Sequence, residues 1–172
     1  MISAYMNYIY RWDQCIKPVT LPPGFVLQLG DISAGSNTPK MVSKVLDWRK
    51  ENLTLCESMW ADLSSLSNLI NLNLEKLCLI AKENNREYVE AFEKMSKTVM
   101  PAKCPVDATE CEQSFLNISI TFKKYRAIMK EMGIRSGVEI EPEQQTMLLD
   151  SCLDLPGVLA AAVPGGTFHY IN

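Results

Sequence analysis

The sequence has little metal-binding chemistry, because His169 is its only histidine and no two of its six cysteines form a Cys-x-x-Cys pair. Structural zinc sites use four Cys or His ligands at short spacings, so the sequence gives little support for a zinc site, and we assign no metal ligand. We interpret the cysteines as reduced thiols. Cys78, Cys111 and Cys152 fall on apolar helix faces, where we expect them to act as small core residues.

The sequence also lacks an excess of positive charge and any long apolar run. Seventeen basic and twenty acidic residues give a formal charge of −3, whereas nucleic-acid-binding proteins carry a basic stripe. No apolar run approaches the ~18 residues of a membrane span. Residues 1–15 lack the basic and apolar regions of a signal peptide. We therefore expect a cytoplasmic protein that binds neither nucleic acid nor membrane.

Hydrophobic residues are plentiful, at 47% of a 172-residue chain, so the chain can bury a core. This length suits one domain or part of a larger one. Helical periodicity begins at Thr38, a suitable N-cap, and Pro39, which suits the first helical position. Apolar residues recur at helical spacing through about 55–84, and a shorter helix around Phe92 ends before Pro101.

The clearest helical pattern lies between residues 111 and 132. Its apolar residues alternate steps of four and three along one face: Cys111, Phe115, Ile118, Phe122, Tyr125, Met129 and Met132. We expect Gly133 to end or kink this helix. Pro142 begins another short helix, which Pro156 and Gly157 break.

Two short apolar runs, 25–29 and 158–163, are bounded by glycine and proline and are typical of buried strands. Together with the helices they predict an α+β fold, helix-rich, with an incomplete antiparallel sheet packed against the helices. So few strands leave sheet edges exposed, which is an aggregation hazard. We therefore expect the 172 residues to be part of something larger.

The loop before the first helix reads GDISAGSNTPK, from Gly30 to Lys40, and has the chemistry of an anion site. A helix N-terminus presents unpaired N–H groups and a partial positive charge. Gly35 supplies a bend, Ser36 and Thr38 supply hydroxyls, and Lys40 supplies a cation. The alternative is an ordinary turn capped by Thr38.

A second glycine loop, Pro164-Gly165-Gly166, follows the apolar run 158–163. Paired glycines allow a ligand to approach the backbone closely, but they also occur in plain turns. No P-loop and no nucleophile–base arrangement is present. We interpret His169 as a surface residue rather than a catalytic base.

Two segments resemble motifs of fungal-type phosphomevalonate kinases. The first is GDISAGSNTPKMVSKVLDWRKEN, which is similar to the family pattern GD-x-x-x-G-S-x-T-P-x-(M/L)-V-x-K-V. The second is SGVEIEPEQQTMLLDSCLDLPGVLAAAVPG, which is similar to (S/A)G-x-x-I-E-P-x-x-Q-T-x-L-L-D followed by a G-V-L strand and a Pro-Gly loop. The motifs keep the family's order, and the resemblance covers about residues 18–166.

This family belongs to the GHMP kinases, whose fold has two α+β halves with the active site between them. Its members transfer the γ-phosphoryl group of ATP to phosphomevalonate in the mevalonate pathway, which leads to sterols and other isoprenoids. The resemblance implies that residues 1–172 form a partial C-terminal GHMP-type domain, with 1–17 outside the match and a terminal strand missing. ATP and Mg²⁺ are the implied cofactors. Phosphomevalonate and the missing N-terminal half are the implied partners.

By position, the resemblance implies that Gly35, Ser36, Thr38 and Lys40 hold the substrate's phosphate end. Gly165 and Gly166 correspond to a glycine-rich motif at the floor of the cleft. The family's ATP loop, Pro-x-x-x-Gly-Leu-Gly-Ser-Ser, is absent from the sequence, so we assign no catalytic residue.

The C-terminal loop also departs from the family's Pro-Gly-Ala-Gly-Gly-Tyr-Asp. We therefore expect the chain to be inactive as a kinase by itself. One alternative is a non-catalytic homologue that acts as a helical binding or regulatory module. Another is a helix-rich structural domain whose glycine loops are turns.

Overall fold

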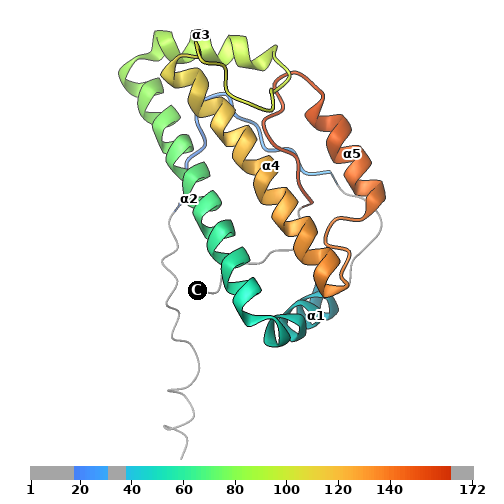
Figure 1. The fold of residues 1–172 in the computed structure, drawn as a ribbon. Coiled ribbons are helices and arrows are strands. Elements are labelled where there is room, and N and C mark those ends of the chain that lie inside the picture. The colour runs from blue at the N-terminus through green and yellow to red at the C-terminus, as the bar shows by residue number, and fades with distance from the viewer. Residues whose placement is uncertain (1–17, 31–37, 164–172) are drawn as a thin grey trace, which may run out of the picture.

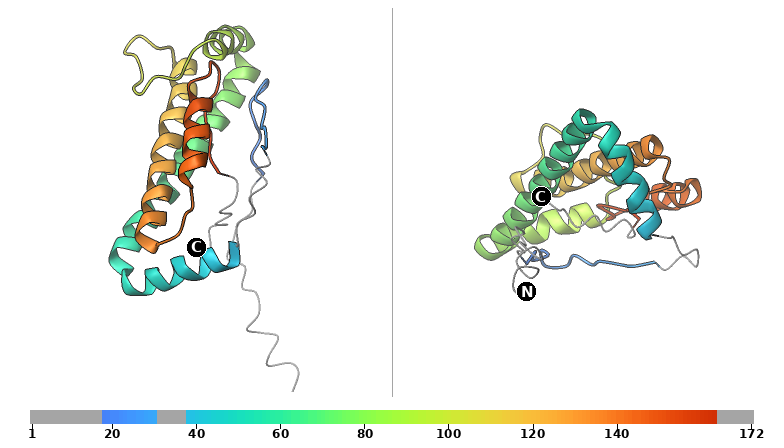
Figure 2. Two further views of the ribbon diagram at one scale, coloured as in Figure 1. Left: turned by 90° about the vertical axis from the view of Figure 1, so that its right-hand side faces the viewer. Right: turned by 90° about the horizontal axis from the view of Figure 1, so that it is seen from below.

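The computed structural model describes residues 18–30 and 38–163, and these residues form an all-helical array. Its helices are α1 (Thr38–Glu51), α2 (Leu53–Glu83), α3 (Asn85–Ser96), α4 (Glu110–Ser136) and α5 (Glu143–Leu153). The two long helices, α2 and α4, lie side by side (Figure 1). α3 lies across one end of this pair, α1 lies across the other end, and α5 flanks α4 (Figures 1 and 2).

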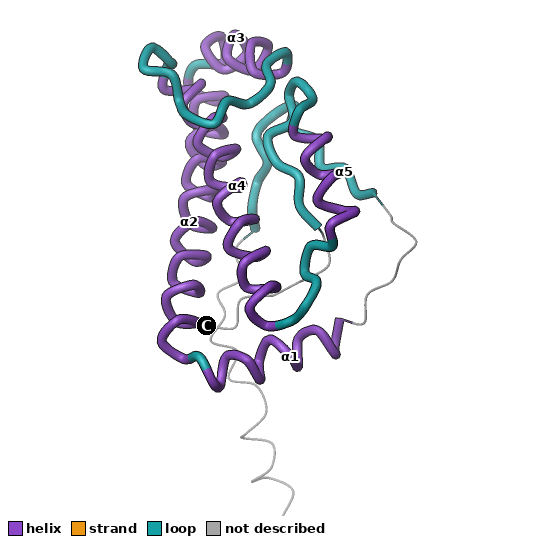
Figure 3. The backbone as a smooth tube through the Cα atoms, turned by 45° about the vertical axis from the view of Figure 1, so that its right-hand side comes forward, coloured by secondary structure: helices purple, strands orange, loops and turns teal. Residues whose placement is uncertain are grey.

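The predicted α+β fold is wrong for the described residues, because neither apolar run forms a strand. Figure 3 shows residues 18–30 and 154–163 as loops. A strand needs a neighbouring strand to accept and donate its backbone hydrogen bonds, and no such neighbour exists within the described residues. The Phe25 N–H instead donates to Pro22 in a local turn, and the Val158 N–H donates to Leu155. No antiparallel sheet therefore forms here.

The run at 25–29 is not buried as predicted either. Val26, Leu27 and Leu29 are about three-quarters exposed, and only Phe25 turns inward. Phe25 stacks on Phe115 of α4, with ring centroids 5.6 Å apart. Leu159, from the second run, packs against the same core cluster. The two runs are therefore held by single side chains on the helices rather than by backbone pairing.

The main core lies between α2, α3 and α4, as the helical periodicity predicts. Every residue of the predicted seam from Cys111 to Met132 is buried or half-buried. Cys111 is fully buried, as predicted, but Cys78 and Cys152 are only half-buried, and the fully buried Cys56 was missed. The cluster consists of Ile70, Leu74, Leu77, Tyr88, Ala91, Met95, Met100, Cys111, Phe115, Leu116 and Ile118.

Helix α4 does not end at Gly133, which was one of the two outcomes expected there. It begins at a capping box formed by Thr109 and Glu112 and runs to Ser136. Gly137 ends it in the left-handed conformation, with φ of 65°, which glycine adopts without strain. Gly133 serves another purpose. A Cβ there would lie 2.7 Å from the carbonyl oxygen of Val138, so glycine lets the chain after α4 fold back against the helix.

A second cluster ties α1 to this folded-back chain. It contains Val45 of α1, fully buried, with Val138 and Ile140 from the connection between α4 and α5. Met59 and Leu63 of α2 and Met132 of α4 complete it. By contrast, α5 begins after Pro142, as predicted, but buries none of its side chains. α1 is therefore fixed by apolar packing, whereas α5 must be held by other contacts.

Candidate functional site

The structure describes only part of the predicted substrate site. Thr38 and Lys40 lie in the first turn of α1, which begins at Thr38 itself rather than at Pro39. The other predicted residues, Gly35, Ser36, Gly165 and Gly166, lie outside the described residues. The first turn of α1 contains no acidic residue. No carboxylate there neutralises the partial positive charge of the helix N-terminus.

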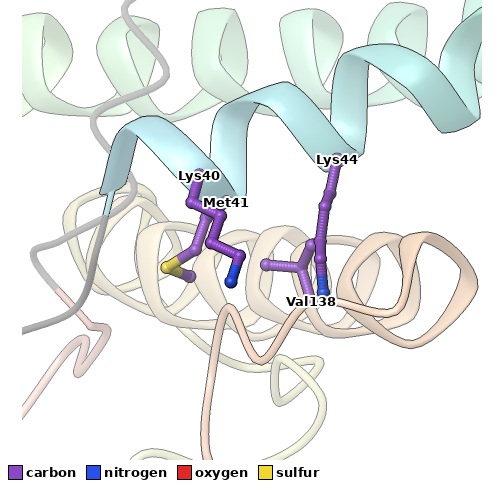
Figure 4. Close-up of a pocket in the computed structure, with 4 residues that line it drawn as sticks. All are labelled: Lys40, Met41, Lys44 and Val138. Carbon is purple, nitrogen blue, oxygen red and sulfur yellow. The ribbon is translucent and has the colours of Figure 1, made fainter.

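An open pocket of about 240 Å³ lies beside the start of α1. It is lined by Lys40, Met41, Lys44 and Val138, and we call it the α1 pocket. Lys40 and Lys44 are one helical turn apart, and Figure 4 shows their ammonium groups extending on one side of α1 toward the chain that carries Val138. Like charges at this spacing disfavour one another. An anion in the pocket would interact favourably with both.

Lys44 lines the α1 pocket, and the sequence reasoning did not name it. The signal was present, because the pattern M/L-V-x-K-V has its fixed lysine at Lys44, whereas Lys40 occupies a variable position. The structure adds the reason to include it: the two side chains share one wall of the α1 pocket. Lysine binds phosphate as a point charge, so either side chain suits this task.

The opposite wall comes from the second motif. Val138 follows Gly137 directly, and its N–H donates to the Gly133 carbonyl at 2.9 Å. Its side chain is 8% exposed and belongs to the same apolar cluster as Val45 of α1. The two family-like segments are far apart in sequence. They meet at the α1 pocket, which motif order alone did not predict.

The polar residues of the second motif surround Arg126 of α4. Arg126 donates from Nε to Glu141 Oε2 at 2.6 Å and from Nη2 to Glu141 Oε1 at 2.7 Å, and Nη1 reaches Asp150 Oδ1 at 2.7 Å. The Thr146 hydroxyl donates to Glu141 Oε1 at 2.6 Å. We call Arg126, Glu141, Thr146 and Asp150 the Arg126 clamp.

The Arg126 clamp is a structural contact that joins α4 to the chain around α5, rather than an open binding site. The Arg126 side chain is 12% exposed and that of Glu141 is 5% exposed. Hydrogen bonds from Arg126 hold the pKa of Glu141 below its usual value, and bonds to Glu141 and Asp150 raise the pKa of Arg126. Sequence reasoning missed Arg126, because its burial is visible only in the structure. A nearly buried arginine requires a carboxylate partner, and the motif supplies two.

The described residues contain neither a candidate metal site nor an activated thiol. Among them, no group of three or more His, Cys, Asp or Glu side chains is placed to hold a metal ion. Their cysteines are free thiols, and burial raises the pKa of Cys111 to about 11. Such a thiol is a poor nucleophile at neutral pH. No helix among these residues has the length and apolarity needed to cross a membrane.

Comparison with known proteins confirms the resemblance to phosphomevalonate kinases. The chain is 33% identical over 161 residues to the peroxisomal phosphomevalonate kinase of Arabidopsis thaliana, covering 90% of this chain and 32% of that protein. The enzyme of Candida albicans is 31% identical over 92% of this chain and 32% of its own length. The enzyme of Aspergillus fumigatus is 32% identical over 91% of this chain and 27% of its own length.

The chain thus spans about a third of the length of the curated relatives that it matches. No protein-family model matches the chain, and no solved structure matches it significantly.

Proposed function

We propose that this relative of the phosphomevalonate kinases is a portion of such an enzyme and binds the phosphate end of phosphomevalonate in the α1 pocket. The complete enzyme would transfer the γ-phosphoryl group of ATP to phosphomevalonate. One observation carries the proposal: the two family-like segments converge on the pocket, with Lys40 and Lys44 on one wall and Val138 on the other. The similarity over about 90% of the chain supports it.

The chemistry of the pocket suits a phosphate monoester. Two ammonium groups and the positive end of α1 lie together, and the Thr38 hydroxyl is in the same first turn. Gly35 and Ser36 remain predicted contributors from the loop before α1. Holding the acceptor phosphate would orient it for in-line transfer, since phosphoryl transfer depends mainly on positioning and on neutralising charge.

ATP and Mg²⁺ belong, in this proposal, to the part of the kinase that corresponds to the other two thirds of the relatives. The family's ATP loop does not occur in these 172 residues. Within the described part of the chain, no acidic cluster suits a metal ion. Gly165 and Gly166 are proposed to lie at the floor of the same cleft. The chain's own task is therefore to bind and orient the acceptor.

The cellular location remains a prediction. The sequence favours a cytoplasmic protein, whereas the Arabidopsis relative is named a peroxisomal enzyme. Fluorescence microscopy of the full-length gene product would decide between these compartments.

A titration of the isotope-labelled chain with phosphomevalonate tests the binding site. Amide signals of residues 38–45 should shift, and Lys40→Met combined with Lys44→Met should weaken binding at least about tenfold, or about 1.4 kcal/mol. Lys82→Met, an exposed lysine in the last turn of α2, is the matched control and should change nothing. Unchanged signals at 38–45 in the unmodified chain would refute the proposed site.

The second candidate is a non-catalytic homologue that serves as a helical binding or regulatory module. It is favoured by the loop at Pro164, which reads Pro-Gly-Gly-Thr where the family has Pro-Gly-Ala-Gly-Gly. Co-expression with the N-terminal portion of a related kinase separates the two readings. Turnover of ATP and phosphomevalonate by the pair, but not by either part alone, would support the kinase. Binding without turnover would support the module.

A further inference from the structure

One wall of the α1 pocket lies on helix α1, and the other lies on a turn. A turn has no helical hydrogen bonds, so other contacts must hold it in place. The lysines project from α1, which is anchored by the buried Val45. Val138 lies instead in the turn that joins α4 to α5, residues 137–142, which we call the connecting turn. The position of the connecting turn therefore decides where Val138 lies relative to Lys40 and Lys44.

The start of the connecting turn is fixed by its backbone. Gly137 adopts φ of 65°, the Val138 N–H donates to Gly133, and the missing Cβ of Gly133 leaves room for the Val138 carbonyl. The Ile140 N–H donates to the Val138 carbonyl at 2.9 Å, which tightens the turn further. These contacts fix only the end of the turn nearest to α4.

The far end is fixed by Arg126. Glu141 directly follows the buried Ile140, and both of its carboxylate oxygens accept hydrogen bonds from Arg126. This two-point contact sets both the position and the orientation of the carboxylate. α5 gives little help, because it buries none of its side chains and is joined to α4 through Asp150 and Thr146. The connecting turn is thus held by the apolar packing of Val138 and Ile140, by the glycine contact at its start and by the Arg126 clamp at its far end.

We infer that Arg126 is a positioning residue for the α1 pocket: by holding Glu141 it fixes the connecting turn and sets Val138 opposite Lys40 and Lys44. This inference rests on the proposed function and assigns a task to the Glu-Pro-x-x-Gln-Thr-x-Leu-Leu-Asp motif. Glu141 of that motif holds the scaffold of the phosphate site and does not touch the substrate. Arg126 itself touches no ligand in this arrangement.

Arg126→Met tests the inference, because it keeps an aliphatic chain of similar length and removes the hydrogen bonds from Arg126 to Glu141 and Asp150. We expect faster hydrogen exchange at the amides of Val138 and Ile140. We also expect phosphomevalonate binding, followed at the amides of Lys40 to Lys44, to weaken about tenfold. Arg126→Lys restores one charge and should recover part of the affinity. Asp150→Asn leaves the Arg126–Glu141 pair intact and should leave the affinity unchanged.

Two controls separate positioning from general loss of stability. Arg135→Met removes an exposed ion pair with Glu131 on the same helix and should alter neither readout. Tyr88→Phe removes a buried hydrogen bond at the end of the molecule opposite α1, so it should lower stability but leave the affinity unchanged. If Arg126→Met does not fold, Glu141→Gln provides the same comparison with one acceptor oxygen retained.

The outcomes distinguish the two proposals. If the unmodified chain binds phosphomevalonate and folded Arg126→Met binds it equally well, the positioning role is refuted and the proposed function stands. If the unmodified chain shows no binding at Lys40 to Lys44, the proposed function fails and the positioning role fails with it. Equal loss of affinity in Tyr88→Phe and Arg126→Met would also refute positioning, since stability alone would then explain the effect.

Discussion

Gly133 and Val138 are in close backbone contact: a Cβ on Gly133 would lie 2.7 Å from the Val138 carbonyl oxygen and 3.3 Å from two side-chain atoms of Ile140. Gly133 is an interior residue of α4, where glycine costs about 1 kcal/mol relative to alanine. Glycine is needed at this position because the connecting turn folds back onto the helix there and leaves no room for a Cβ. The contact places Val138 beside α1.

Gly133→Ala should therefore destabilise the protein despite its better helix propensity. The clashing atom belongs to the backbone of a turn that is held at both ends, so it cannot move away as a flexible side chain would. We expect a loss of about 1–3 kcal/mol, as for other overpacked sites, measured by urea unfolding. Gly30→Ala is the control, because a Cβ there meets no atom within 4 Å. Equal or greater stability of Gly133→Ala would contradict this account.

The helical part of the fold was predictable because it depends on periodicity. The seam from Cys111 to Met132 gave both the helix and its buried face. The strand prediction failed because a short apolar run such as 25–29 has no periodicity that separates strand from loop. Strand formation depends on a partner strand, and the described residues provide none.

The proposed site was predictable only in part. Thr38 and Lys40 follow from the chemistry of the loop before α1, and Lys44 could be read from the first motif. The contact of Val138 with α1 and the pairing of Arg126 with Glu141 depend on how α4 and the connecting turn pack in three dimensions. No spacing rule links Arg126 to a carboxylate beyond its own helix, so this part required the structure.

Tyr88 fastens the N-terminal segment to α3, and its loss should be measurable. Its hydroxyl donates to the Pro23 carbonyl at 2.6 Å, the side chain is 3% exposed, and burial raises the pKa of its phenol. Tyr88→Phe leaves that carbonyl without its donor, so we expect a loss of about 0.5–1.5 kcal/mol. Urea unfolding measures it. Hydrogen exchange at the Phe25 amide should accelerate, and an unchanged rate would show that the bond does not hold the segment.

Burial should determine which thiols react. Burial raises the pKa of Cys56, and it raises that of Cys111 to about 11, so few thiolates form at neutral pH. Cys104 lies in a loop and is only half-buried. We expect iodoacetamide to label Cys104 well before Cys56 and Cys111 in the folded protein, as followed by mass spectrometry. Labelling of all three at one rate in native buffer would contradict the closed core between α2, α3 and α4.

Protonation of Glu141 should make the clamp acid-sensitive. Hydrogen bonds from Arg126 lower the pKa of Glu141 in the folded protein, so the folded state favours the ionised carboxylate. A group whose folded pKa is depressed stabilises the protein fully above its unfolded pKa, about 4.3 for glutamate. That contribution is lost as the pH falls through the lower, folded pKa. The groups facing Glu141 are Arg126, Thr146 and Lys130, and the Arg126 guanidinium stays charged throughout this window.

Unfolding by urea between about pH 3 and about pH 7 measures this loss. The unmodified chain should lose stability below about pH 4.3 more steeply than Glu141→Gln, which has no carboxylate to protonate. Glu139→Gln is the matched control, because it removes an exposed charge two residues away and keeps the clamp intact. Its pH profile should follow that of the unmodified chain. If Glu141→Gln shows the same steep loss, the acid sensitivity arises elsewhere and Glu141 is not held as an ionised partner of Arg126.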